Sequence, residues 1–180
     1  TGAAVEAALR EAGYSTLRAD PSDPRFVKKM LTLKSRVEIV FNALHGAGGE
    51  DGVIQGFLEV LGLPYTGSGV LASALCMNKD MVKELFAVHG IPTPLHQTAT
   101  KGQPFALKLK YPVVAKPCRG GSTIGVSIVK RSGALARGLA AAWRHDTEAV
   151  VEEYIPGKEL TVAVVNGRAL PVIEVVPQNE

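Results

Sequence analysis

Apolar positions in the first half of the chain follow helical spacing in some stretches and strand-like spacing in others. The helical pattern predicts helices over residues 3–11, 26–31, 51–60, 70–77 and 78–89. Short apolar runs predict strands over 14–19 and 37–42. Gly13, Gly62 and Gly90 follow three of the helices, where a left-handed residue commonly ends a helix. Because parallel strands need crossover connections, this order favours a parallel sheet flanked by helices.

After Pro92, Pro94 and Pro104 the pattern changes to short strands with a single helix. Strands are expected over 113–116, 126–129, 150–154, 160–165 and 169–176, and a helix over 133–145. Asn166-Gly167 predicts a two-residue hairpin between the last two strands. We therefore expect an α/β chain with a parallel-sheet domain over residues 1–93 and an α+β domain with an antiparallel sheet over 94–180.

Composition narrows the functional class. The chain has 180 residues, 46% of them hydrophobic and 21% charged, as in globular proteins. The net charge is +3 without a block of like charges, so nucleic acid is not an expected partner. No run approaches the roughly 20 apolar residues of a membrane span. Cys76 and Cys118 lack metal or redox spacing and no leader pattern opens the chain, which favours a reducing cytoplasm.

The 19 glycines gather at 46–56, 62–69 and 120–125, beside apolar segments. The last group belongs to residues 116–125 (KPCRGGSTIG), between two expected strands. Backbone N–H groups and hydroxyls of such a loop can hold phosphate oxygens while Lys116 supplies charge, although the order differs from a Walker loop. A flexible hairpin with a solvated lysine fits the same residues.

Three further segments carry candidate chemistry. In residues 152–159 (EEYIPGKE), strand alternation sends Glu152 and Glu153 to opposite faces, and Glu159 follows a turn where it can accept from ribose hydroxyls. His45 lies between an expected parallel strand and a helix, at the sheet edge where ligands bind. Lys79 begins a helix, where a cation is better explained if an anion shares the site. Surface carboxylates, a loop histidine and a solvated lysine remain alternatives.

Taken in this order, the segments resemble the D-alanyl-D-alanine ligase family of the ATP-grasp superfamily. The resemblance rests on residues 41–56 (FNALHGAGGEDGVIQG), residues 63–74 (LPYTGSGVLASA) and the lysine-bearing helix after them. It implies a pre-ATP-grasp N-terminal domain followed by the central ATP-grasp subdomain. It also implies ATP-dependent ligation of two D-alanines through an acyl phosphate, for peptidoglycan synthesis.

The resemblance assigns roles residue by residue. Lys79 and Lys116 would contact ATP phosphates, and Ser122 and Thr123 would lie in the loop closing over them. Glu152 would reach the adenine amino group, with the backbone of Glu153 and Ile155 completing that edge, and Glu159 would hold the ribose. His45 would lie near the first D-alanine, and Ser122 would help orient a catalytic hydrogen-bond network.

The resemblance also implies parts that this chain does not supply. The family's first strand would precede Thr1, and the tyrosine loop, the oxyanion arginine and the ligands for Mg²⁺ or Mn²⁺ would follow Glu180. We therefore assign no metal ligand and expect the 180-residue chain alone to be inactive. Family members are usually homodimers. A D-alanine–D-lactate or D-alanine–D-serine ligase, or a non-catalytic nucleotide-binding piece, remains an alternative.

Overall fold

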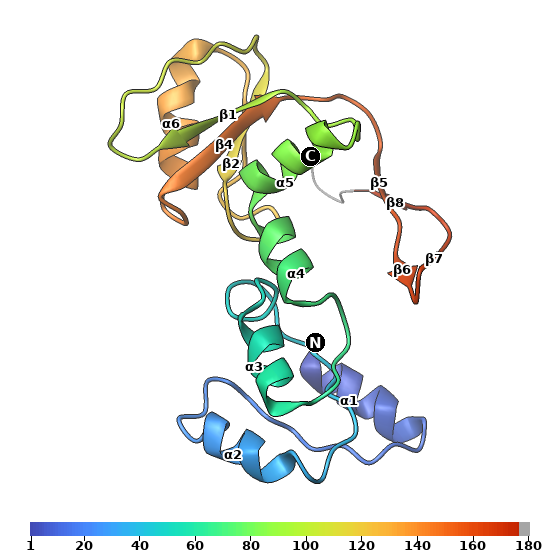
Figure 1. Cartoon of the computed structure of the whole chain (residues 1–180). Coiled ribbons are helices and arrows are strands. Elements are labelled where there is room, and N and C mark those ends of the chain that lie inside the picture. The colour runs from blue at the N-terminus through green and yellow to red at the C-terminus, as the bar shows by residue number, and fades with distance from the viewer. Residues whose placement is uncertain (177–180) are drawn as a thin grey trace.

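The computed structural model describes residues 1–176, so residues 177–180 at the end of the second predicted domain lie outside the described part. The chain forms two lobes, each with its own hydrophobic cluster, joined through two consecutive helices, α4 (Val70–Met77) and α5 (Lys79–Val88) (Figure 1). The first lobe contains α1 (Gly2–Glu11), α2 (Phe26–Leu33) and α3 (Val53–Leu61). Within residues 1–176, no helix is long and apolar enough to span a bilayer.

Packing of α2 against α3 forms the first cluster. Ile54, Leu58 and Leu61 bury one stripe of α3, as the helical spacing predicts. Gly62 adopts φ 69° and ends the helix in the left-handed conformation, so its predicted role as a stop is confirmed. The cluster comprises Met30, Leu33, Ile54, Leu58, Leu61 and Leu63.

The expected parallel sheet of the first lobe is reduced to one bridge in the described residues. Val40 pairs in parallel with Tyr65: the Val40 amide donates to the Pro64 carbonyl at 2.8 Å, and the Thr66 amide donates to Val40 at 3.0 Å. Segment 14–19 and the rest of 37–42 form no strand. Their prediction as strands was wrong because a strand is defined by a backbone partner, which apolar alternation does not supply.

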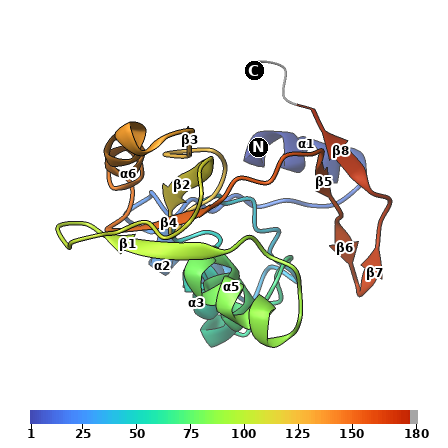
Figure 2. The same ribbon diagram turned by 90° about the horizontal axis from the view of Figure 1, so that it is seen from above.

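The second lobe is built on an antiparallel sheet in the order β1-β4-β2-β3. Its strands are β1 (His96–Thr100), β2 (Val113–Pro117), β3 (Ser127–Val129) and β4 (Glu148–Glu153). A helical turn, η1 (Ser132–Ala134), leads into α6 (Leu135–Ala142), which covers one face, while α5 lies against the other (Figure 2). The predicted α+β architecture is confirmed, and β1, which the sequence pattern missed, forms one edge.

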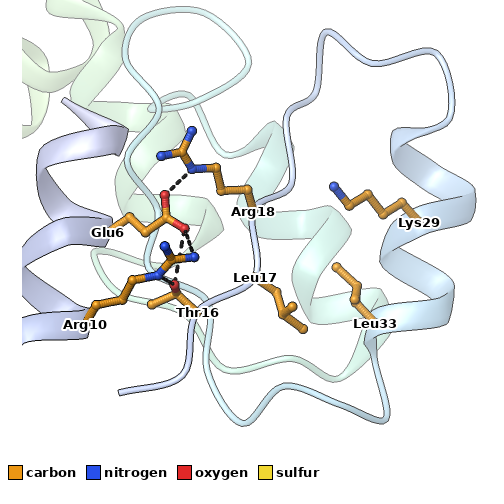
Figure 3. A pocket seen from close by; sticks show the side chains of 7 residues that line it. All are labelled: Glu6, Arg10, Thr16, Leu17, Arg18, Lys29 and Leu33. Atoms are coloured by element: carbon orange, nitrogen blue, oxygen red, sulfur yellow. Dashed lines mark hydrogen bonds and ion pairs between the residues drawn. The ribbon is translucent and has the colours of Figure 1, made fainter. Parts of the chain in front are cut away.

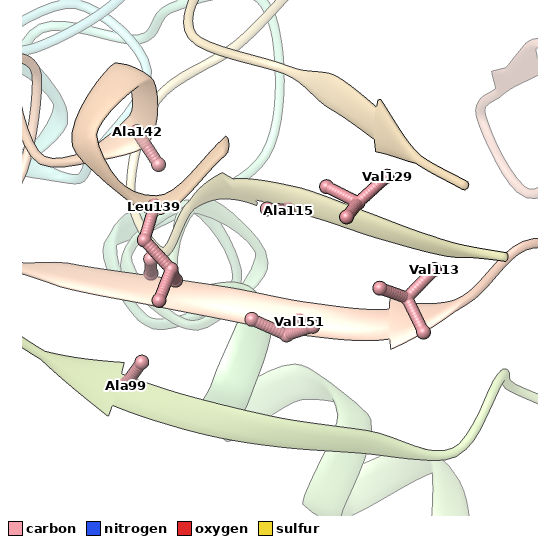
Figure 4. Close-up of a cluster of buried hydrophobic side chains, with 8 residues drawn as sticks. Ala99, Val113, Ala115, Val129, Leu139, Ala142 and Val151 are labelled. Carbon is pink, nitrogen blue, oxygen red and sulfur yellow. The ribbon is translucent and has the colours of Figure 1, made fainter. Parts of the chain in front are cut away.

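Side chains along β4 alternate between the two faces of the sheet, so one face packs in the core and the other carries Glu152. Val151 lies in the cluster beneath α6 (Figure 4), and so does Ala149, two residues earlier. Val150 and Glu152 therefore face the opposite side, where Glu152 contacts Lys83 of α5. Gly138 lets α6 approach closely, since a Cβ there would lie 2.8 Å from Val129 Cγ2. The cluster comprises Ala99, Val113, Ala115, Val129, Leu139, Ala142, Ala149 and Val151.

Two short hairpin ladders follow β4. They pair β5 (Glu159–Thr161) with β8 (Ile173–Val175), and β6 (Val164–Val165) with β7 (Arg168–Ala169). Asn166 and Gly167 both have positive φ, 49° and 77°, which is the backbone of a primed hairpin turn. The predicted Asn-Gly hairpin is therefore confirmed.

Candidate functional site

A buried carboxylate between two lysines forms the centre of the candidate site. Glu152 projects from β4 toward α5, where Lys83 Nζ lies 2.8 Å from its Oε2 atom. Lys116, on the neighbouring strand β2, donates to the Oε1 atom of the same carboxylate. Burial alone would raise the pKa of Glu152, but the hydrogen bonds and charges of Lys116 and Lys83 outweigh it, and the pKa is lowered. Glu152 is therefore ionised at neutral pH.

Lys79 reaches the same region from the start of α5. Asn78 caps the helix by accepting from the Met81 amide, and the Lys79 amide donates to the Cys118 carbonyl at 2.9 Å. The Lys79 ammonium donates to the Gly120 carbonyl at 2.7 Å. Burial, followed by the positive charge of Lys116, lowers the pKa of Lys79. Two lysines thus share a partly desolvated space, which favours an incoming anion.

Residues 118–125, called here the glycine loop, are held at both ends. The Arg119 guanidinium pairs with Asp146 at 3.0 Å and with Glu148 at 2.5 Å. At the other end, Gly125 has φ 72° and packs so closely that a Cβ would lie 2.8 Å from His145 Cδ2. Ser122 and Thr123 lie exposed between these anchors, and Ser122 has φ 57°.

The histidine loop, residues 45–52, approaches the glycine loop from the first lobe. Its shape is set internally, because Glu50 accepts from the Gly46 amide at 2.6 Å and Asp51 from the Gly48 amide at 2.8 Å. A Cβ on Gly121 would lie 3.8 Å from Glu50 Oε2, so the two loops meet there. His45 is exposed, with its Nδ1 atom 3.9 Å from Glu50 Oε1.

The remaining predicted residues extend from the end of β4. The Glu153 carboxylate accepts from the Leu95 amide at 3.1 Å, which ties the strand end to the segment before β1. Ile155 is exposed just after the strand. Glu159 begins β5, and no hydrogen bond or ion pair within residues 1–176 joins its side chain to Lys79, Lys116 or Glu152.

Sequence reasoning missed Lys83, which is only 6% exposed. A signal was available, since Lys83 follows Lys79 by one helical turn and therefore shares its face of the helix. It also missed Arg119 as an anchor of the glycine loop, because its partners on and before β4 are distant in the sequence.

A separate cavity of about 500 Å³ lies in the first lobe (Figure 3), and none of Lys79, Lys83 and Lys116 lines it. Glu6 projects into it, accepts from Arg18 and pairs with Arg10 at 2.7 Å. None of the predicted site residues lines it; its lining residues are Glu6, Arg10, Thr16, Leu17, Arg18, Lys29 and Leu33.

The site has the chemistry of a polyphosphate site with an adjacent hydrogen-bond acceptor. Lys79 and Lys116 supply positive charge beside a glycine-rich loop with exposed hydroxyls, and Glu152 offers a buried anionic acceptor. Within residues 1–176, no cluster of three or more His, Cys, Asp or Glu side chains forms a metal site.

The fold of solved relatives defines the class. A crystal structure of D-alanine–D-alanine ligase from Bacillus anthracis complexed with ATP superimposes with a TM-score of 0.86 at 33% identity, covering 100% of this chain and 61% of that one. A D-Ala:D-Ser ligase from Enterococcus faecalis superimposes with a TM-score of 0.64 at 35% identity, covering 77% of this chain and 41% of that one. The chain thus has the fold of ATP-grasp ligases, as expected from the sequence.

Family profiles give the particular assignment. The profile described as D-ala D-ala ligase N-terminus matches residues 5–68, and that described as D-ala D-ala ligase C-terminus matches residues 87–180. The chain belongs to the D-alanine–D-alanine ligase family. A D-alanine–D-alanine ligase of Syntrophotalea carbinolica is 48% identical over 179 residues, covering 99% of this chain and 58% of the relative. The chain therefore spans well under two thirds of that relative's length.

Proposed function

We propose that this chain supplies the ATP-binding half of an enzyme that joins two D-alanines to D-alanyl-D-alanine. The observation that carries the proposal is the convergence of Lys79 and Lys116 on the glycine loop beside ionised Glu152, within a chain of this family. Two cations next to exposed loop hydroxyls suit the triphosphate of ATP, and the B. anthracis relative is complexed with ATP.

Roles for the side chains follow from their positions and from the family resemblance. Lys79 and Lys116 contact the phosphates, and Ser122 and Thr123 close over them from the glycine loop. Glu152 accepts from the adenine amino group, with backbone groups of Glu153 and Ile155 along the same edge. Glu159, at the start of β5, holds the ribose.

The proposed reaction has two steps. The carboxylate of the first D-alanine takes the γ-phosphoryl group of ATP, and the amine of the second D-alanine attacks the resulting acyl phosphate and releases phosphate. His45 lies near the first D-alanine, and Ser122 orients hydrogen bonds at the reacting groups. Lysines and N–H donors neutralise the charge that develops during phosphoryl transfer. Mg²⁺ or Mn²⁺ is expected with ATP, and we assign no ligand to it here.

The relatives support D-alanine, and not D-serine, as the proposed second substrate. The relatives from S. carbinolica and Gloeobacter violaceus, which are 48% and 43% identical and match 99% of this chain, are both named D-alanine–D-alanine ligase. We further propose a cytoplasmic enzyme of peptidoglycan synthesis that acts as a homodimer, without nucleic acid or membrane partners. The two cysteines, both free thiols, support a reducing compartment.

The test uses a hybrid enzyme in which this chain replaces the matching segment of the S. carbinolica ligase. Phosphate release by the hybrid is measured with D-alanine, D-serine and D-lactate. We expect D-alanine-dependent release, with D-alanyl-D-alanine as the product. The 180-residue chain alone should bind ATP in calorimetry without releasing phosphate. A hybrid that folds but needs D-serine or D-lactate would contradict the assigned substrate, and a chain that binds no ATP would contradict the assigned site.

A further inference from the structure

Lys83 is a buried cation whose ammonium is held by protein oxygens, next to Glu152, the proposed contact to adenine. Its ammonium donates to Thr93 Oγ1 at 2.7 Å and to the Pro94 carbonyl at 2.9 Å, and it lies 2.8 Å from Glu152 Oε2. Thr93 and Pro94 accept two of the three ammonium hydrogens, and the Glu152 carboxylate is held as an ion pair. Lys83 is 6% exposed and Glu152 is 7% exposed. The lysine is therefore held by three protein oxygens and almost closed to solvent.

Lys116 differs from Lys83 in its exposure and in the number of partners of its ammonium. Its side chain is 21% exposed, against 7% for Lys83, and within residues 1–176 its ammonium has one partner, Glu152. Lys116 is thus free to turn toward a phosphate, while Lys83 is held by Thr93 and Pro94. If Lys116 turns to a phosphate, Lys83 is the cation that stays beside Glu152.

When Lys116 turns to the phosphates, the Glu152 carboxylate loses one of its two neighbouring positive charges. A buried carboxylate without a cation takes up a proton, and a protonated carboxyl is a poorer acceptor for an amino group. Glu152 Oε2 is buried and makes no well-aligned hydrogen bond within the described residues, so the Lys83 charge is what balances that oxygen.

We infer that Lys83 is a positioning residue for nucleotide selection: it keeps Glu152 ionised and oriented toward the adenine amino group while Lys116 moves to the phosphates. The inference rests on the proposed ATP site and extends it to a residue that touches no part of the nucleotide. Thr93 and Pro94, just before β1, act with it by fixing the ammonium.

The test compares ATP with ITP, which carries a carbonyl where ATP carries the amino group. Dissociation constants of both nucleotides are measured by calorimetry for the 180-residue chain and its variants. Ionised Glu152 accepts from the amino group and repels the carbonyl, so the unaltered chain should prefer ATP. A hydrogen bond to a charged group corresponds to about tenfold in affinity or more. Lys83→Met should therefore lower the ATP-to-ITP preference about tenfold, to near one.

Three further single variants and one double variant separate positioning from general stability. Lys110→Met removes an exposed lysine of the same size and should leave the preference unchanged. Thr93→Val keeps every charge but removes one hydrogen bond to Lys83, so the preference should fall about threefold. Glu152→Gln should abolish the preference, and adding Lys83→Met to it should lower the ratio no further.

Each outcome is decisive. A Lys83→Met chain that weakens both nucleotides equally, with the ATP preference intact, would show a merely structural role and overturn the inference. If that variant does not fold, an unchanged preference in Thr93→Val would overturn it. Equal binding of ATP and ITP by the unaltered chain would refute adenine recognition by Glu152 while leaving the phosphate site standing. Binding of neither nucleotide would remove the proposed function itself.

Discussion

The Lys79 ammonium donates to the carbonyl oxygen of Gly120, 2.7 Å away, across the gap between α5 and the glycine loop. The lysine that begins the helix is thus already turned toward the loop that we propose closes over the phosphates. Its pKa is lowered, first by burial and then by the charge of Lys116. ATP binding would replace a neutral carbonyl with an anion as the partner of Lys79.

This lowered pKa predicts an alkaline limit to ATP binding. As pH rises toward 10.5, the ordinary value, Lys79 loses its proton early and its contribution to ATP affinity is lost. Lys79→Arg keeps its charge over that range, so its ATP affinity should persist to higher pH. Calorimetric titrations from neutral to alkaline pH check this, with Lys101→Arg, at an exposed position, as the control. Coincident pH profiles for Lys79→Arg and the unaltered chain would refute the assignment.

Removal of Lys116 should chiefly impair the use of ATP. In the hybrid with the S. carbinolica ligase, Lys116→Ala should raise the KM for ATP about tenfold or more, the value of a charge-assisted hydrogen bond. The KM for D-alanine should change little, because Lys116 lies on β2 in the second lobe. Lys110→Ala is the matched control. Unchanged ATP kinetics would mean that the glycine loop is wrongly assigned.

The lowered pKa of Glu152 links stability to pH. Burial opposes ionisation, but Lys116 and Lys83 more than offset it, so the folded carboxyl binds its proton less readily than the unfolded one. The stabilisation is fully present above the ordinary value of 4.5 and is lost as pH falls through the lowered folded value. Glu152→Gln lacks this stabilisation at every pH.

Urea unfolding at several pH values measures this difference. Breaking a buried ion pair costs about 3–5 kcal/mol, so Glu152→Gln should be less stable than the unaltered chain by about that amount near neutral pH. The difference should shrink as pH falls below 4.5. Glu84→Gln, at an exposed position on the same helix as Lys83, should show no such trend. A difference independent of pH would argue against the ionised pair.

Gly125 provides a test of how the glycine loop is anchored. Its φ of 72° is unfavourable for other L-residues, and a Cβ would meet His145 at 2.8 Å and Pro117 at 2.9 Å. Gly125→Ala should lower the free energy of unfolding by about 1–2 kcal/mol from the backbone alone and should weaken ATP binding. Gly133→Ala has open space and no positive φ, so it should be neutral in both assays. Tight ATP binding by Gly125→Ala would show that the anchor is dispensable.

Local signals explain which parts of the structure could be predicted. Gly62 and the Asn166-Gly167 turn fix backbone conformations by themselves, and both were predicted correctly. Strand β1 has the polar sequence HQTAT and exists because it pairs with β4, so no apolar pattern indicated it. Conversely, segment 37–42 has a strong strand pattern but forms only the bridge at Val40.

The candidate site also contains residues that a local motif reveals and residues that only the packing reveals. Lys79 and Lys116 stand beside their own motifs, and the sequence indicated them as cations near a loop. The pairing of Lys83 with Glu152 joins α5 to β4, and only the packing of that helix against the sheet reveals it. Glu159 was predicted as a ribose contact, and this role stays a prediction.

The boundary predicted at residues 93/94 can be tested through Trp143, the chain's single tryptophan. Its indole donates to the Ala99 carbonyl at 3.1 Å and packs against the second lobe's cluster, so its fluorescence reports on that lobe. Leu58, 1% exposed, lies in the first lobe's cluster. Leu58→Ala should destabilise the first lobe by about 2–5 kcal/mol.

If the two lobes unfold as separate domains, Leu58→Ala should lower the midpoint of the far-ultraviolet circular dichroism transition in urea and leave the Trp143 transition in place. Leu139→Ala, which truncates a buried leucine of α6 in the other cluster, should move the Trp143 transition instead. Contacts of Lys83 and Lys79 with the second lobe make α5 the element whose loss would follow Trp143. Equal shifts of both transitions in both variants would mean that the lobes unfold as one unit, because their shared helices couple them.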